Sequence, residues 1–222
     1  MKRHILTAAL ILTPAFAFAA TSSWEIDPSH SSAAFTVKHM MVTNVRGEFR
    51  KVSGKIDLDD KDVTKSTVDA TIDATSIDTN EPKRDGHLKS PDFFDVEKYP
   101  TITFKSTKVA KGGPNKLKVT GDLTIHGVTK PVVLDVQGPS PVMKDPWGNE
   151  KRAVMATTKI SRKDFGLNWN KTMESGGVLV GDDVNIELNL ELGKSQPANT
   201  AETKAETKTD TKMGGADAGM KK

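Results

Sequence analysis

The stretch Val-Asn-Ile-Glu-Leu-Asn-Leu-Glu-Leu, residues 184–192, alternates apolar and polar side chains without a break. Successive side chains of a β-strand point to opposite faces, so this alternation predicts a strand with one dry face and one wet face. One-sided strands are typical of antiparallel sheets, because parallel sheets are usually covered on both faces. The stretch therefore predicts an antiparallel β protein.

The same period of two recurs through much of the chain. It is found at Val68–Ala74 and Leu117–Ile125, and in shorter form at Ala33–Val37, Val52–Leu58, Ile102–Phe104 and Val132–Val136. Gly, Pro, Asn and Asp, which favour turns, separate these runs. About eight strands are expected, which predicts an all-β fold closed into an antiparallel barrel. An eight-stranded barrel is either filled by its own side chains or holds one small ligand.

One or two short helices are expected beside the strands. The first is predicted near Pro82–Ser90, with Asn80 as its N-cap and Pro82 in its first turn. The second is predicted at Ser161–Phe165, with Ser161 as its N-cap.

The two ends of the chain differ from its middle. Residues 1–20 have the features of a secretory signal: Lys2 and Arg3, an apolar run at Ile5–Thr13, and small residues around Ala19. The apolar run is shorter than the roughly 20 residues that span a bilayer. Residues 194–222 repeat Ala-Glu-Thr-Lys and contain no aromatic, Ile, Leu or Val, which predicts a disordered tail. The sequence thus predicts a signal peptide at 1–20, one β-barrel domain at 21–193 and a disordered tail at 194–222.

Charge and cysteine content exclude several classes of protein. The chain has no cysteine, so no disulfide stabilises it despite the predicted export. The net charge is +3, of which the signal and the tail contribute +2 each, so the domain is near −1. A nearly neutral domain has no electrostatic footprint for nucleic acid. No phosphate-binding or dinucleotide-binding glycine motif occurs, so no cofactor is predicted.

The pattern alone leaves the barrel interior undecided. Small residues recur at dry-face positions, which indicates either unfilled volume or small side chains packed against large ones: Ala33, Gly54, Ala70, Ala74, Gly121 and Ala153. Several aromatic and apolar side chains lie outside the regular strands, where they form either the mouth of a pocket or a lid over the core: Phe49, Phe93, Phe94, Phe165, Leu167 and Trp169.

The polar residues give little sign of catalysis. Four histidines remain after signal removal, at 30, 39, 87 and 126, and none has the spacing of a metal site, so no metal is predicted. His39 shares the parity of the dry face and is expected to offer a polar contact to a ligand. Asp85, His87 and Ser90 suggest a hydrolase triad, but Asp85 and His87 are two residues apart and point in different directions on a helix. A polar network of Arg84 and Asp85 that fixes the loop is favoured instead.

Eight ordered motifs between Trp24 and Leu192 resemble those of the YceI-like family of lipid- and polyisoprenoid-binding proteins. In chain order they are Trp24-x-Ile26-Asp27-x-x-His30-Ser31, Phe35-x-Val37-x-His39, Gly47-x-Phe49, Ser76-Ile77-Asp78-Thr79-Asn80, Arg84-Asp85-x-His87-Leu88-Lys89-Ser90-x-x-Phe93-Phe94, Tyr99-Pro100-x-Ile102-x-Phe104, Gly121-x-Leu123-Thr124-x-His126-Gly127-Val128-Thr129-Lys130 and Arg162-x-Asp164-Phe165-Gly166. The resemblance implies a lipocalin-like antiparallel eight-stranded barrel with an elongated apolar pore that holds a long isoprenoid or other amphiphilic lipid. It also implies export, often to the periplasm, a membrane b-type cytochrome as partner in some members, and no catalytic machinery.

The predicted function is therefore lipid binding in an apolar tunnel. The residues expected to contact the lipid are Phe35, Val37, His39, Phe49, Ile72, Phe93, Phe94, Phe104, Leu123, Phe165 and Trp169. Arg84, Asp85 and His87 are expected to shape the mouth. Two other hypotheses stay open: an enzyme that acts on a lipid or its diphosphate through His87 and Asp85 or a metal, and a stress-linked module that docks a membrane redox partner through the barrel rim or the tail.

Overall fold

The computed structural model describes residues 21–174 and 176–195, so the predicted signal peptide and nearly all of the predicted tail lie outside the described residues. Twelve strands hydrogen-bond in one sheet: β1 Thr21–Ile26, β2 Ser32–His39, β3 Thr43–Phe49, β4 Val52–Asp59, β5 Thr67–Asp73, β6 Ile77–Asp78, β7 Thr101–Gly113, β8 Lys116–Ile125, β9 Val128–Gln137, β10 Met143–Lys144, β11 Glu150–Ser161 and β12 Val180–Lys194. One α-helix, α1 Pro82–Lys89, and three 3₁₀ turns, η1 Val63–Lys65, η2 Ala74–Ser76 and η3 Arg162–Phe165, complete the described part.

Eight of these strands close into a ring. Their order is β11-β9-β8-β7-β5-β4-β1-β12, and β12 then pairs with β11 again. All pairings in the ring are antiparallel. The predicted eight-stranded antiparallel barrel is confirmed.

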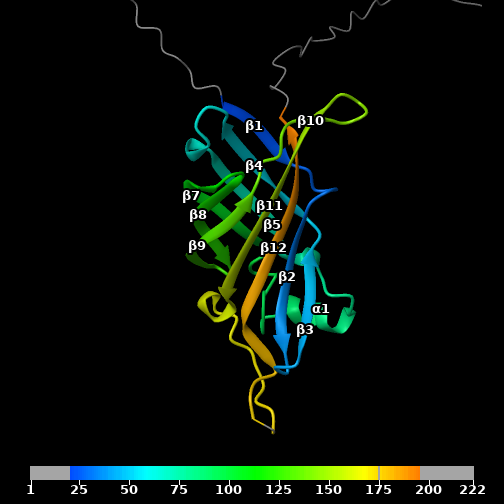
Figure 1. Cartoon of the computed structure of the whole chain (residues 1–222). Coiled ribbons are helices and arrows are strands. Elements are labelled where there is room, and N and C mark those ends of the chain that lie inside the picture. The colour runs from blue at the N-terminus through cyan, green and yellow to red at the C-terminus, as the bar shows by residue number, and fades with distance from the viewer. Residues whose placement is uncertain (1–20, 175, 196–222) are drawn as a thin grey trace, which may run out of the picture.

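The long strand β12 is the element on which the barrel is built, and Figure 1 shows it running the length of the molecule. One edge of β12 pairs with β11 from Asp183 to Gly193. The opposite edge pairs first with β2 and then with β1. The alternating stretch 184–192 thus presents its apolar side chains to the interior from a strand that is hydrogen-bonded on both edges.

The seam between β9 and β11 is short. Only three residue pairs join the two strands, Met155–Thr157 opposite Asp135–Gln137, whereas β8 and β9 are joined by ten. Side-chain bonds extend the seam at either side: the Thr158 hydroxyl donates to the Val133 carbonyl at 2.9 Å, and the Ala153 N–H donates to the Ser140 hydroxyl at 2.9 Å. With three register pairs each, this junction and that between β1 and β12 are the shortest of the ring.

Helix α1 covers the side of the barrel next to β3 and β6 (Figure 1). Its N-cap is Glu81, whose carboxylate accepts the Lys83 N–H at 3.1 Å, and Pro82 is its first residue. The prediction of Asn80 as cap is wrong, because Asn80 has a left-handed backbone with φ of 60° one residue before the cap. The second predicted turn is η3, and although Ser161 occupies its N-cap position, the Ser161 side chain makes no capping bond.

Two of the glycines on the dry faces are there because a phenylalanine ring covers them. A Cβ on Gly121 would lie 2.4 Å from the Phe104 ring, and one on Gly47 would lie 2.4 Å from the Phe35 ring. At these places a missing side chain marks close packing and not empty space. Ala153 is exposed on the outer face of β11, so its predicted place on the dry face is wrong; Ala156, of the opposite parity, is the buried alanine of that strand.

The described chain begins and ends at the same end of the barrel. Trp24 pairs with Lys194, and the Ser195 N–H donates to the Ser23 carbonyl at 2.9 Å. We call this the termini end. The β2–β3 turn and the loop 166–179 project from the opposite end, the hairpin end (Figure 1). Within residues 21–174 and 176–195, no helix is both long and apolar enough to cross a bilayer.

Candidate ligand-binding cavity

An apolar cavity of about 230 Å³ lies inside the barrel. A water molecule requires roughly 10–15 Å³ on this scale, so the space corresponds to about fifteen or more water-sized groups. Forty-one residues line it, and only four of them have polar side chains: Ser66, Thr103, Thr158 and Arg162. A space with so few hydrogen-bonding groups suits a hydrocarbon better than it suits water or a polar metabolite.

The cavity is elongated along the barrel. Its lining on β12 begins at Val180 and ends at Leu190. Ten residue steps of about 3.3 Å make this distance roughly 33 Å along the strand. Alternate residues of the neighbouring strand β11 line the adjoining wall, from Val154 through Ala156 and Thr158 to Ile160. The shape that follows is a channel, longer than it is wide, enclosed by strands.

Three phenylalanine rings form one side of the channel. The Phe35 and Phe49 ring centroids are 5.7 Å apart, and those of Phe49 and Phe94 are 5.5 Å apart with the rings edge to face. Edge-to-face contacts at this spacing are favourable and fix the ring orientations. The segment after α1 thus contributes Phe94 to the wall, and Phe93 and Phe165, which also lie outside the regular strands, join the lining.

Nine of the eleven predicted ligand-contact residues line the cavity: Phe35, Val37, Phe49, Ile72, Phe93, Phe94, Phe104, Leu123 and Phe165. His39 and Trp169 do not. His39 is the last residue of β2, opposite Val180 where the register with β12 shifts, so the inward parity of β2 ends before it. The Trp169 ring packs behind the wall, 5.3 Å from the Phe93 ring.

Arg84 and Asp85 form the polar network that the sequence suggests, and Thr79 is its centre. The Asp85 carboxylate accepts the Thr79 N–H at 2.9 Å and the Thr79 hydroxyl at 2.5 Å. Arg84 Nε donates to the Thr79 hydroxyl oxygen, and Arg84 Nη2 donates to the Thr79 carbonyl, each at 2.8 Å. Because Thr79 is only 4% exposed and follows β6, these bonds tie α1 to the sheet.

His87 is not part of that network. Its Nε2 lies 2.8 Å from the Asp92 carboxylate, and its ring packs edge to face on Phe93 and Trp169. The Ser90 hydroxyl donates to the His87 carbonyl, not to its ring. Asp85, His87 and Ser90 are therefore close in sequence but do not form a relay of hydrogen bonds.

Arg162 is a lining residue that sequence reasoning missed. It is 4% exposed, and burial lowers the pKa of its guanidinium. All five of its N–H donors have acceptors. Nε donates to the Gly181 carbonyl, Nη1 donates to the carbonyls of Leu167 and Trp169, and Nη2 donates to the Val180 carbonyl and the Asp182 carboxylate. Its signal in the sequence is the parity of β11, since residue 162 continues the inward series 154, 156, 158, 160.

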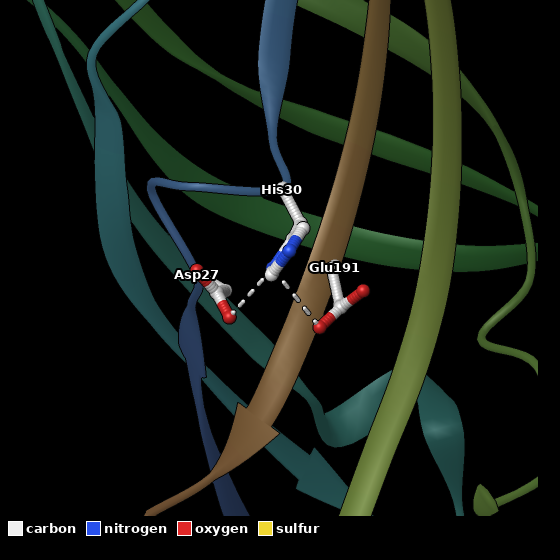
Figure 2. Close-up of side chains that lie close together, drawn as sticks. All are labelled: Asp27, His30 and Glu191. Carbon is white, nitrogen blue, oxygen red and sulfur yellow. Dashed lines mark hydrogen bonds and ion pairs between the residues drawn. The ribbon is translucent and has the colours of Figure 1, made fainter. Parts of the chain in front are cut away.

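A second polar cluster lies outside the cavity, near the termini end (Figure 2). His30 Nδ1 is 3.2 Å from the Asp27 carboxylate and 3.6 Å from that of Glu191, a grouping of the kind that can hold a metal ion. The Lys151 ammonium, however, already lies 2.8 Å from Asp27 and 2.9 Å from Glu191.

Lys151 therefore occupies the position of a cation between the two carboxylates. Its hydrogen bond, followed by that of the Ser29 hydroxyl, holds the pKa of the Asp27 carboxyl well below its usual range. The bonds to Asp27 and Glu191 in turn raise the pKa of Lys151. The cluster thus joins the β1–β2 turn to β11 and β12, and we call it the Lys151 clasp.

Comparison with known proteins agrees with this architecture. A UPF0312 protein of Vibrio parahaemolyticus is 38% identical over 170 residues, which cover 75% of this chain and 89% of the relative. The crystal structure of Burkholderia cenocepacia BcnA matches with a TM-score of 0.64 at 26% identity, over 75% of this chain and 98% of that one.

A third match is the structure of a polyisoprenoid binding domain from Saccharophagus degradans, with a TM-score of 0.58 over 78% of this chain and 99% of that one. At 17% identity this likeness concerns the fold alone. The model of the YceI-like domain matches residues 24–192, the same part of the chain that forms the barrel and its cavity. The chain therefore belongs to the YceI-like family.

Proposed function

We propose that this protein is an exported carrier that holds a long isoprenoid, or a similar amphiphilic lipid, in the barrel cavity. The observation that carries the proposal is the lining: 37 of 41 residues, all but the four polar ones named above, offer only apolar side chains. The lipid would be held by burial of its chain, with no directional bond required along most of its length.

The length of the channel favours a long chain over an ordinary acyl chain. One leaflet of a bilayer is about 15 Å of hydrocarbon, half of the roughly 30 Å core, whereas the lining on β12 extends over roughly 33 Å. Each buried methylene contributes about 0.8 kcal/mol, so about fifteen buried carbons contribute about 12 kcal/mol. After an association cost of about 4 kcal/mol, this leaves roughly the 8 kcal/mol of micromolar affinity. The Saccharophagus degradans domain of similar fold binds polyisoprenoids by name, which supports the same chemical class of ligand.

The test is the lipid content of the protein as purified. Native mass spectrometry and organic extraction are expected to find one lipid of isoprenoid type per chain. A protein that is isolated empty and takes up no added prenyl chain would contradict the proposal.

A matched pair of variants on β11 tests the site. Ala156 is 3% exposed and lines the cavity, whereas Ala153 is exposed on the same strand. If the ring in Ala156→Phe displaces three methylenes of the ligand, affinity falls by about 2.4 kcal/mol, or roughly 50-fold. Ala153→Phe is expected to bind as the parent does. Equal binding by both variants, with both folded by circular dichroism, would place the ligand elsewhere.

We propose the periplasm as the location of the mature protein, on the basis of residues 1–20. The expected mature chain begins at Thr21. Fractionation of producing cells and the intact mass of the protein check both statements, and an unprocessed chain in the cytosol would contradict them.

Binding is favoured over catalysis. Asp85 is engaged by Thr79 and His87 by Asp92, so the two residues of the enzyme hypothesis serve different partners. His87→Ala is expected to leave lipid uptake unchanged.

We also propose a membrane b-type cytochrome as partner. The test is co-purification of the cytochrome with the full chain and with a variant that lacks residues 194–222; equal recovery would remove the tail from that interaction.

A further inference from the structure

The turn between β2 and β3 exposes three consecutive apolar side chains at the hairpin end. Met40 is 46% exposed, Met41 59% and Val42 76%. The Val42 N–H donates to the His39 carbonyl at 3.0 Å, which closes the turn. Runs of exposed apolar residues are unfavourable in water and are retained mainly where they contact something.

The backbone of this turn makes the two methionines more unusual. Both have positive φ, 51° for Met40 and 62° for Met41, at the two central positions of the turn. A hairpin turn of this type favours Asn-Gly, because most side chains are strained there. The sequence therefore retains methionine at two positions where asparagine and glycine would give a more stable and more soluble turn.

The turn lies next to one end of the cavity. His39 pairs with Val180, and both Val180 and Val37 line the cavity. Met40 is three residues from Val37, and its N–H donates to the Leu179 carbonyl at 2.8 Å. Five other large apolar side chains are exposed among the described residues: Val133 and Met155 on the barrel strands β9 and β11, and Val142, Met143 and Trp147 around β10 at the termini end. None of these five has the positive φ of Met40 and Met41.

The size and charge of the surface indicate what it contacts. Three partly exposed side chains fall far short of the roughly 800 Å² per partner of a stable protein interface. Such a tip is sufficient to enter the boundary between lipid headgroups and acyl chains. Lys38 and Lys171 flank it, since Lys38 precedes His39 and the Lys171 carbonyl accepts the Leu179 N–H at 2.9 Å. Three acids lie near this end, Glu174, Asp182 and Asp183; Asp182 is paired with Arg162 and Lys163, and Asp183 is paired with Lys159. Neither flanking lysine forms an ion pair among the described residues. Their long side chains can place an ammonium at anionic headgroups.

We propose that residues 40–42 insert into the surface of a lipid bilayer and that the lipid chain enters and leaves the cavity at this end. The statement about the lipid chain rests on the proposed function; the statement about docking does not. The two are tested by different measurements.

The docking test uses the protein as purified, with its C-terminal segment intact, and vesicles of phosphatidylethanolamine and phosphatidylglycerol. Met40→Asn combined with Met41→Gly is expected to lower the partition coefficient in co-sedimentation by about tenfold, which is about 1.4 kcal/mol. The thermal midpoint is expected to stay the same or rise, since the turn becomes less strained. Unchanged vesicle binding would overturn the proposal.

Trp147→Ser is the matched control, because it removes an exposed apolar side chain from the β10–β11 turn, which lies at the termini end since Lys151 pairs with Gly193 there. It is expected to bind vesicles as the parent does. If it loses binding and the methionine variant does not, the docking surface is at the termini end and the proposal is wrong. If the parent self-associates without vesicles and the methionine variant does not, the turn is a contact between copies, which also overturns it.

The lipid content of the methionine variant separates this inference from the proposed function. We expect native mass spectrometry to find the same lipid in variant and parent, while the rate of lipid transfer to vesicles falls about tenfold with the partition coefficient. Empty protein whose vesicle binding still depends on Met40 and Met41 would refute the carrier function and leave the docking surface standing.

Discussion

The two ends of the barrel are each held by one cation, but in different surroundings. At the termini end, Lys151 lies between the carboxylates of Asp27 and Glu191, with 22% of its side chain exposed. At the hairpin end, Arg162 is 4% exposed and donates to four backbone carbonyls and to Asp182. The first end depends on charge that water and salt reach, and the second depends on hydrogen bonds that they do not reach.

This difference bears on how each end is used. A buried arginine with all donors occupied fixes the backbone of the loop that leads into β12, next to the turn proposed to meet the bilayer. Its four bonds to backbone carbonyls are neutral at the acceptor and shielded from salt, whereas its ion pair with Asp182, 43% exposed, and the ion pairs of the Lys151 clasp are open to screening. Three changes test whether the two ends behave this differently, and one at Thr79 compares them with the polar network beside α1. They are given from the largest expected effect to the smallest.

Replacing Arg162 is expected to have the largest effect on stability. Arg162→Met removes the side-chain donor to the carbonyls of Gly181, Leu167 and Trp169, while the Val180 carbonyl keeps Asn170 and Asp182 keeps Lys163. We expect the free energy of unfolding to fall by about 3 kcal/mol or more. Urea denaturation measures it. The control is Lys163→Met, which removes an exposed partner of Asp182 and is expected to cost about 0.5 kcal/mol or less. Similar losses in the two variants would mean that the arginine acts through charge alone.

The second test concerns the other polar network on the side that α1 covers. Thr79→Val removes the hydroxyl that donates to Asp85 and accepts from Arg84. Because Thr79 is buried, we expect a loss of about 2 kcal/mol in urea denaturation. Thr79→Ser keeps the hydroxyl and is expected to recover most of that loss, and a serine variant as unstable as the valine variant would assign the effect to packing.

The third test is the salt dependence of the clasp. Lys151→Met leaves two carboxylates facing one another, and we expect a loss of about 1.5 kcal/mol at low ionic strength. At about 1 M salt the screening length is about 3 Å, so the loss should shrink. Denaturation curves at both salt concentrations decide the matter. A loss that does not change with salt would show that the clasp resembles the Arg162 end after all.

The smallest expected effect is on acid stability. The pKa of Asp27 is lowered in the folded protein, so its contribution is fully present above the unfolded value of about 3.9 and is lost as pH falls toward the folded pKa. Asp27→Asn lacks this contribution at every pH. Its stability should therefore decline less steeply than that of the parent below about pH 4, by about 1 kcal/mol in total. Parallel pH profiles would contradict this assignment.

Period two in the sequence predicted the barrel and most of its lining, because inward and outward positions alternate strictly along β8 and β12. The prediction failed at His39, because β2 ends there and its register with β12 shifts. It also failed at Ala153, because the inward residues of β11 are the even-numbered ones. It also could not show that Gly121 and Gly47 lie under phenylalanine rings, since those contacts join different strands.

Arg162 escaped prediction for a related reason. Nothing local shows that a charged residue at the end of an apolar series will be buried, because its acceptors come from residues 167–182, which the fold brings to it. The Lys151 clasp likewise joins residues more than a hundred positions apart. Short-range patterns set the strands, and long-range pairing decides which polar side chains are enclosed.

The three-pair seam between β9 and β11 has a consequence for hydrogen exchange. The junction of β1 with β12 also has three register pairs, but β2, outside the ring, continues it along the same edge of β12 with seven more. Every other junction of the ring has five or more. Partial opening of lowest free energy should therefore separate β9 from β11, with amides there exchanging before those between β11 and β12. Opening at this junction widens the barrel interior while the remaining strands stay paired. The cavity can therefore accept ligands of different width without global unfolding.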